Sequence, residues 1–265
     1  MKNSKDKILI LISIAALLFV CSLKLNAQNI EIGVRYNPEF TGLMNTNDNN
    51  AGNALKYTSN FGYFSFGAGA IINFNNNIGL AVDILFSREG QRFAGNTTDN
   101  PPDATTYSSV VYTQVSLNNI VIVGDYVAKA ELNYIKLPLM LSLTSDNTKP
   151  FFLTLLVGPQ FNFLQSVAQE VNHNDLDYPN SNIKPMDLYK TVTINGVLAL
   201  GGAYNLTPHL VLSARLRFDY GFDDVENKDV MVSYYGAAPV RFYSTDRQAT
   251  HNITGGLMLG LDLKL

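Results

Sequence analysis

The clearest regularity in this chain is a strict alternation of apolar and polar residues. Leucine occupies every odd position of 257–265, while the even positions include Asp262 and Lys264. Apolar residues also occupy every second position of 210–220, against a largely polar alternate set. Successive side chains of a strand point to opposite faces, whereas a helix would spread these polar residues into its apolar stripe. Both segments are therefore predicted to be strands with one apolar face.

Six further segments follow the same rule, so eight strands are expected. Their ranges are 30–36, 64–74, 78–87, 134–143, 151–163, 192–204, 210–220 and 257–265. Such lengths suit the roughly 9–11 tilted residues with which a strand crosses a membrane. The apolar faces carry no charged residue, which matters because an Arg or Lys facing lipid at mid-bilayer costs about 2–4 kcal/mol.

Short and long connections alternate along the chain. The short links are 75–77, 145–149 and 205–208, and the long polar stretches, interpreted as loops, are 37–60, 88–131, 165–190 and 222–250. Structureless loops longer than about 15 residues are uncommon in compact soluble domains. Short turns at one end, long loops at the other and an even strand number are typical of outer-membrane barrels. The expected fold is thus all-β, an eight-stranded antiparallel transmembrane barrel.

A soluble barrel with an apolar interior would show the same alternation, but the placement of aromatic and charged residues favours lipid outside. Aromatic residues lie near both ends of the apolar faces, as interfacial girdles do: Phe74, Phe151 and Tyr204 at one end, Tyr36, Phe86, Phe163 and Tyr220 at the other. The polar faces carry charges of both signs, expected to form a structural network in the lumen: Glu31, Arg35, Asp83, Lys136, Arg215, Arg217, Asp219, Asp262 and Lys264. Because side chains can fill an eight-stranded interior, a plug is favoured over an anion-selective pore.

The first 27 residues show the three-part pattern of a secretory signal peptide. Lysines lie within 2–7, an apolar run follows at Ile8–Val20, and Ala27 is a small residue suited to cleavage. The run is shorter than the roughly 20 residues of a spanning helix, so a retained anchor is disfavoured. Lipidation of Cys21 is disfavoured because bulky residues precede it. We expect a signal peptide over 1–27 and one barrel domain over 28–265.

Composition removes several other classes of protein. The single cysteine excludes a disulfide framework or a multi-thiolate metal site, and 19 basic against 22 acidic residues argue against a nucleic-acid partner. Only 15% of residues are charged, below the roughly 25% of soluble domains. The uncharged stretch 191–214 could be a transmembrane helix, but Asn195, the Gly201–Gly202 pair and Pro208 favour strand, turn and strand.

Candidate chemistry is sparse. His251 is expected to face the lumen beside Asp219 and Asp223, where a hydrolase could activate a serine, but a solvated rim histidine is favoured. The acidic residues within 219–229 lack the spacing of a calcium loop and are interpreted as solvated. The Gly67–Ala68–Gly69 sequence lies in a strand with no helix after it, which disfavours a phosphate site. We expect no catalytic residue, metal or cofactor, and a protein that is not an enzyme.

Two adjacent segments, Tyr134–Leu143 and Pro150–Phe161, resemble the paired central strands of the PorT-type outer-membrane β-barrel family of Bacteroidota. That family has a Tyr-Leu-x-Ile-Pro-Leu strand followed by Pro-Tyr-x-x-x-Gly-Pro. The strands at Ile32–Tyr36, Gly67–Ala70 and Leu212–Tyr220 also sit where the family has them. The resemblance implies the barrel fold, and it implies an accessory role in assembling a protein secretion system as one alternative. Many such barrels end in an aromatic residue, whereas this chain ends in Leu265.

The sequence therefore predicts an exported protein of a Gram-negative outer membrane, with four long loops at the cell surface. Its expected role is structural or surface-interacting and porin-like in architecture, with a side-chain-filled lumen. The expected partners are outer-membrane lipid, the barrel-insertion machinery, and surface ligands or secretion-system components that meet the long loops.

Overall fold

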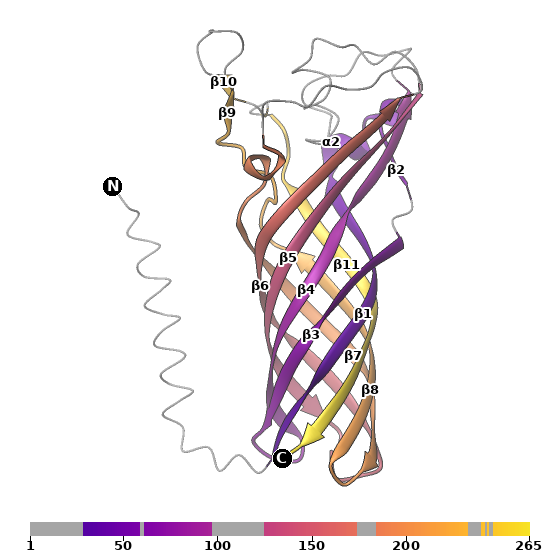
Figure 1. Ribbon diagram of the computed structural model, residues 1–265, viewed down its shortest axis with the longest axis vertical. Helices are drawn as coiled ribbons and strands as arrows, with labels where there is room; N and C mark the ends of the chain where they lie inside the picture. The colour runs from indigo at the N-terminus through magenta and orange to yellow at the C-terminus, as the bar shows by residue number, and fades with distance from the viewer. Residues whose placement is uncertain are drawn as a thin grey trace, which may run out of the picture.

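The strands of this protein close into an antiparallel barrel (Figure 1). The computed structural model describes residues 29–58, 61–96, 125–173, 184–232, 240–241, 243 and 246–265. The barrel strands are β1 (Asn29–Asn45), β3 (Phe61–Asn73), β4 (Ile78–Asn96), β5 (Asp125–Thr144), β6 (Phe151–His173), β7 (Val192–Thr207), β8 (Leu210–Gly221) and β11 (Thr250–Lys264). These eight correspond one to one with the strands predicted from the alternation.

Two pairings close the ring. β1 pairs with β11, with Glu31 opposite Lys264, and β4 pairs with β5, with Ile78 opposite Leu143. Both ends of the barrel sequence therefore lie at the short-turn end, where the backbone N–H of Leu265 donates to the carbonyl of Ile30 at 2.9 Å. The stretch 191–214 forms β7, a tight turn and the start of β8, as the strand interpretation predicted.

The alternation separates an outer face from an interior. Outward side chains are largely apolar and exposed, as along β8, where Leu212, Leu216 and Phe218 point out and Ser213, Arg215 and Arg217 are buried. The inward face takes the polar residues, and Lys136 and Asp219 are fully buried there. The predicted orientation, apolar outside and charged inside, is what the described residues show.

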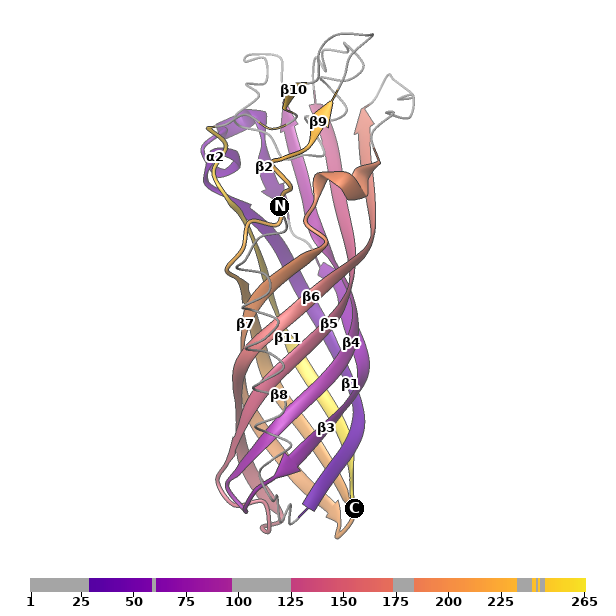
Figure 2. The same cartoon turned by 90° about the vertical axis from the view of Figure 1, so that its left-hand side faces the viewer.

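Several strands run further toward the long-loop end than predicted. The stretches beginning at residues 37, 88 and 165 were interpreted as loops, but β1 continues to Asn45, β4 to Asn96 and β6 to His173. Their pairing continues as well, since Asn96 lies opposite Asp125 and Tyr126 opposite His173. In Figures 1 and 2, β4, β5 and β6 rise past the upper ends of β7 and β8. On β4 and β6, polar outward residues such as Arg88 and Gln165 hid these extensions, whereas on β1 the outward residues Phe40 and Met44 are apolar and Pro38 and Gly42 interrupt the pattern.

Short elements lie at the long-loop end. They are α2 (Thr46–Asn49), η1 (Gly52–Ala54), β2 (Lys56–Thr58), η2 (Pro185–Leu188), β9 (Met231–Val232) and β10 (Val240–Arg241). β2 pairs with β4 above the point where β3 begins, with Tyr57 opposite Phe93. Among the described residues, no helix has the length and apolar character needed to cross a membrane.

Candidate functional site

The outer face is apolar over a limited height. On β4 the outward residues are apolar from Ile78 to Phe86, and Arg88 follows. On β5 they are apolar from Leu143 to Ile135, beyond which Glu131 pairs with Arg88 at 3.0 Å. Nine residues at about 3.3 Å each, tilted by about 40°, span roughly 23 Å, close to the apolar band of a membrane barrel. The strand extensions therefore project beyond that band.

One group of interior charges is centred on Arg35. Its Nη1 donates to Asp262 Oδ1 at 2.5 Å, and its Nε lies 3.4 Å from Asp83 Oδ1. Gly69 stands opposite Asp83 across the strand pair, and a Cβ at this glycine would collide with the aspartate side chain. The absence of a side chain at residue 69 thus makes room for the carboxylate.

Three of the predicted network residues use neutral partners instead. Arg215 donates to Thr154 Oγ1 at 2.7 Å and to the hydroxyl of Ser213, and Glu31 accepts from the Asn73 amide at 3.1 Å. Lys264 lies at the short-turn rim, where its Nζ donates to Asn205 Oδ1 at 2.8 Å. No ion pair within 4.0 Å is found for Glu31, Arg215 or Lys264 among the described residues, although Lys264 stands opposite Glu31.

A second group surrounds Lys136, whose ammonium faces three carboxylates. It forms an ion pair with Glu89, lies 3.5 Å from Asp219 Oδ2 and lies 4.0 Å from Glu39 Oε2. Asp219 also accepts from Arg217 Nε at 2.8 Å. All five side chains are buried, so each charge depends on these neighbours in place of water.

Neutral polar side chains complete this second group. Asn37 and Ser65 donate to Glu39 Oε1 at 2.5 Å each, and Ser87 donates to Glu89 Oε1 at 3.0 Å. Glu39 and Glu89 were not among the nine predicted residues because they lie in stretches interpreted as loops. The sequence did contain a signal for Glu39, because it continues the spacing of Glu31 and Arg35, the inward charged residues at odd positions of the same strand.

Apolar residues pack beside the charges in the interior that the structure describes. A cluster of seven buried residues lies beside the charges, and Arg217 Nη1 contacts Met258 Sδ at 3.7 Å; the seven are Ile71, Ala81, Met140, Leu156, Val197, Ala199 and Met258. At the short-turn end, the cavity bordered by Glu31 and Arg215 has a volume of only about 10 Å³. That is space for about one water molecule.

Toward the long-loop end the interior becomes a conventional hydrophobic core. Phe93 of β4 and Leu132 of β5 are buried there, together with Leu188 of η2 and Val225 from the segment after β8. Backbone bonds tie the segments over this core, since Asn227 N donates to the carbonyl of Leu188 at 2.9 Å. The described loop segments therefore pack down into the barrel mouth.

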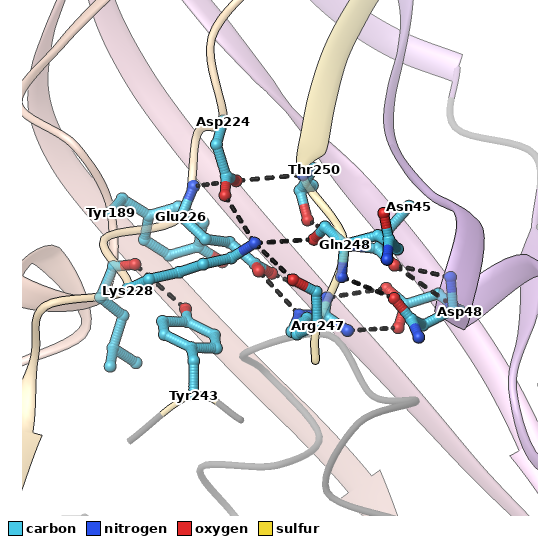
Figure 3. Close-up of polar contacts among 12 residues, drawn as sticks. Asn45, Asp48, Tyr189, Asp224, Glu226, Lys228, Tyr243, Arg247, Gln248 and Thr250 are labelled. Atoms are coloured by element: carbon cyan, nitrogen blue, oxygen red, sulfur yellow. Dashed lines mark hydrogen bonds and ion pairs between the residues drawn. The ribbon is translucent and has the colours of Figure 1, made fainter. Parts of the chain in front are cut away.

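A buried arginine joins the segments at this mouth (Figure 3). Arg247, just before β11, donates Nη1 to Asp48 Oδ1 at 2.8 Å and Nη2 to Asp48 Oδ2 at 3.1 Å. Its Nε and Nη2 donate to the two carboxylate oxygens of Glu226 at 2.7 and 2.8 Å. Such two-pronged contacts are the strongest that a guanidinium forms with carboxylates. We call Arg247, Asp48 and Glu226 the Arg247 clamp.

The Arg247 clamp connects residues distant in sequence. Lys228, which pairs with Asp224 at 2.8 Å, donates to the carbonyls of Arg247 and Gln248. Burial raises the pKa of Asp48 to about 6, although Arg247 acts in the opposite direction. Burial also opposes the charge of Arg247, but the carboxylates of Glu226 and Asp48 outweigh it and raise the pKa of the guanidinium. Burial thus disfavours the charged forms of Asp48 and Arg247, and the contacts within the clamp counter this effect.

Comparison with protein families assigns this architecture. The family model described as "Outer membrane protein beta-barrel domain" matches residues 26–227. The chain belongs to the outer membrane protein beta-barrel domain family. With its closed barrel and apolar outer band, this membership places the protein in the outer membrane. The comparison with curated proteins gives no match.

Solved outer-membrane proteins are similar over most of the chain, at low identity. The attachment invasion locus protein Ail of Yersinia pestis is 11% identical, with 89% of this chain and 98% of that chain covered and a TM-score of 0.39. Neisserial surface protein A is 13% identical, with 89% and 97% covered and a TM-score of 0.41. The outer membrane protease OmpT of Escherichia coli is 9% identical, with 92% and 99% covered and a TM-score of 0.46.

Two sequence-based expectations remain predictions within this family. Membership extends to outer-membrane barrels in general, and the PorT-type assignment is a finer statement that stays a hypothesis. The signal peptide at 1–27 lies outside the described residues.

His251 was expected to face the lumen, and this expectation is wrong. It stands opposite Met44, an exposed residue of the outer face, and its ring stacks on that of Tyr220 at 5.7 Å between centroids. Inward positions of β11 fall on even numbers, such as Asn252, so His251 belongs to the outside. Its Nδ1 lies 3.0 Å from the carbonyl of Gly221.

The interpretation of the acidic stretch within 219–229 as solvated is wrong for part of it. Asp219 is buried in the lumen group and Glu226 in the Arg247 clamp. Asp223 accepts from the backbone N–H of Ile194 at 2.8 Å, and Asp224 from that of Thr250 at 3.0 Å. These carboxylates diverge to different partners, and the described residues contain no group of metal-binding side chains.

Proposed function

We propose that the protein is a non-conducting barrel whose role is structural and surface-interacting, with the long-loop end at the cell surface. The observation that carries this proposal is the buried interior around Lys136, where five charged side chains are held by one another and by neutral donors. A conducting pore would line its interior with hydrated groups, whereas these five residues are each at most 4% exposed. The nine predicted charges, with Glu39 and Glu89 added, serve in this proposal as a structural plug.

The long-loop end supports the surface role. The Arg247 clamp and the core beneath it fix segments from three connections against one another. A surface with fixed shape loses less conformational entropy on binding a partner than free loops would. In this proposal the barrel is a rigid scaffold in the membrane that presents this surface.

Solute passage distinguishes the proposal from a porin role. Liposomes containing the purified protein should swell in arabinose no faster than protein-free liposomes. The control is a variant in which Lys136, Arg217 and Gln160 are all replaced by glycine, which removes three interior side chains at one level. Rapid swelling by the wild-type protein would contradict the proposal.

The secretion-accessory role implied by the PorT-type resemblance is the alternative function. It predicts that deletion of the gene abolishes export of other proteins while the remaining outer-membrane proteins are retained. Normal export by the deletion strain, with a changed surface interaction, would favour the role proposed above.

A further inference from the structure

Two cavities lie one above the other on the outer face, along the pair β1 and β11. The lower cavity, of about 360 Å³, is bordered mainly by aromatic residues, glycine and proline, with Glu39 as its one charged residue; the others are Tyr36, Pro38, Phe40, Phe61, Gly62, Tyr63, Phe64, Gly255 and Gly256. The upper cavity, of about 280 Å³, has a mixed border: the polar and aromatic residues Asn45, Thr46, Asn49, Tyr57, Tyr220, Gln248 and His251 stand beside the apolar Met44, Ala249 and Ile253. Phe40 stands opposite Gly255 and Met44 opposite His251, so the two are about four residues, or roughly 13 Å, apart along the strands.

The lower cavity is a defect in the barrel wall. β3 begins only at Phe61, opposite Phe40, and the pairing of β1 with β3 shifts register at Glu39. Pro38 lacks an N–H to donate, and the pairing of β1 with β11 is interrupted there. The Phe40 ring lies over Gly255, where a Cβ would collide with it. Aromatic rings therefore surround a hollow at the upper edge of the apolar band, level with the end of a lipid-facing surface.

The upper cavity differs in chemistry. Its border contains no carboxylate, lysine or arginine. The amides of Asn49 and Gln248 lie on exposed positions of this border, and the stacked rings of Tyr220 and His251 form one side of it. Since the Gly221 carbonyl can only accept, the proton of neutral His251 lies on Nδ1 and leaves Nε2 as an acceptor.

We propose that the two cavities, together called the track along β1 and β11, bind one glycolipid of the outer leaflet, with a hydrocarbon chain in the lower cavity and a neutral sugar in the upper one. The lower cavity continues the lipid-facing band, and the upper one begins where a headgroup would stand. Amides and an imidazole can donate to and accept from sugar hydroxyls, and aromatic rings suit the apolar face of a sugar ring. An anionic phospholipid headgroup is matched best by a cationic side chain, and this border has no lysine or arginine.

The Arg247 clamp shapes the upper cavity. Asn45 donates Nδ2 to the carbonyl of Gln248 at 2.8 Å, and Gln248 N donates to Asn47 Oδ1 at 2.7 Å. Both bonds join the segment of Arg247 to that of Asp48, as Figure 3 shows for the labelled residues. The inference rests on the proposed function in one respect only: that function places the long-loop end at the cell surface, and so it sets the leaflet from which the lipid comes.

Lipid retention in native mass spectrometry tests the proposal. The full barrel is reconstituted with a monoglucosyl diacylglycerol or with phosphatidylglycerol carrying the same acyl chains, then released into mild detergent. The wild-type protein should retain the glucolipid in preference. Gln248→Ala and His251→Phe should each lower that retention about tenfold, as expected for losing one or two hydrogen bonds. His251→Phe preserves an aromatic ring at this position, so its effect reports on the loss of the two imidazole nitrogens, of which Nδ1 contacts the Gly221 carbonyl.

Matched controls stand elsewhere on the outer face. Gln165→Ala removes an exposed amide of β6, and Phe218→Ala removes a lipid-facing ring of β8. Both should leave retention unchanged, whereas Phe61→Ala should weaken retention of both lipids. Equal retention of glucolipid and phospholipid by the wild type, or equal losses in the controls, would overturn the proposal. A conducting wild-type barrel would contradict the proposed function and leave this result unaffected.

Discussion

Lys136 shows how a single residue organises the interior. Its ammonium is the shared partner of Glu39, Glu89 and Asp219, and none of these groups reaches water. Removing one partner of a buried ion group leaves uncompensated charge, which typically costs about 3–5 kcal/mol. The stability of the barrel should therefore depend on this side chain more than on any lysine at the rim.

Lys136→Met should lower the free energy of unfolding by about 3–5 kcal/mol, measured by urea unfolding in lipid vesicles. Lys264→Met is the matched control, because Lys264 binds neutral groups at the rim and a partly exposed contact contributes at most about 1 kcal/mol. Equal destabilisation by the two substitutions would contradict the central position given to Lys136.

Asp48 makes the clamp sensitive to pH. Its folded pKa of about 6 exceeds the unfolded value of about 3.9, so the folded state binds the proton more tightly. The clamp should be most stable below pH 4, lose stability as pH rises from about 4 to about 6, and then level off. Asp48→Asn should remove this slope.

Amide hydrogen exchange of Gln248, corrected for intrinsic rates, measures this local stability. Asp146→Asn, in a turn at the opposite end of the barrel, should leave the slope intact. The same slope in Asp48→Asn and in the wild type would assign it to another group.

Residue-level prediction succeeded where strand alternation applied. Arg35, Asp83 and Asp262 each occupy the polar face of an alternating strand, so the alternation alone predicted that they point inward. The alternation could not tell which of these side chains contact one another. The contacts of the Arg247 clamp could not be predicted from alternation in the sequence. The two contacts span 199 and 21 residues between irregular segments, where no periodicity relates the partners.

At the scale of elements, the strands divide into a lipid-facing part and a projecting part. Leu216 of β8 lies within the apolar band and is 71% exposed, whereas Val127 of β5 lies above Arg88 and is 50% exposed. The two residues look equally apolar in the sequence. Their surroundings differ because Leu216 is expected to face hydrocarbon and Val127 is not.

Leu216→Arg should cost about 2–4 kcal/mol of folding free energy in lipid vesicles, because it places a cation against the bilayer interior. Val127→Arg should cost less than about 1 kcal/mol, because a residue beyond the interface meets water. Equal costs for the two would contradict the height assigned to the apolar band.

On β4 the predicted strand stopped where its outward residues ceased to be apolar. β4 continues past Arg88 because its pairing with β5 and its inward residues persist, with Phe93 buried in the upper core. A bulge between Asn133 and Tyr134 also shifts the register of β5 against β6. An analysis that follows only the lipid-facing pattern finds the membrane part of a strand and misses the part that behaves like a soluble sheet.

For the whole molecule, the interior is the feature on which the proposed function rests. At the level of the membrane the interior holds the charged side chains and a cluster of apolar residues beside them. A hydrophobic core fills the projecting part, and the Arg247 clamp joins the described loop segments above it. This arrangement leaves the outer surfaces, the loops and the track along β1 and β11, as the places where the protein can meet partners.

Current recording across a planar bilayer tests the closed interior most directly, because potassium and chloride ions pass through pores that are too narrow for sugars. With the wild-type protein inserted, the account expects the current to stay at the bilayer baseline in molar potassium chloride at either polarity. Sustained steps of nanosiemens size from the folded barrel would show an open lumen and contradict it.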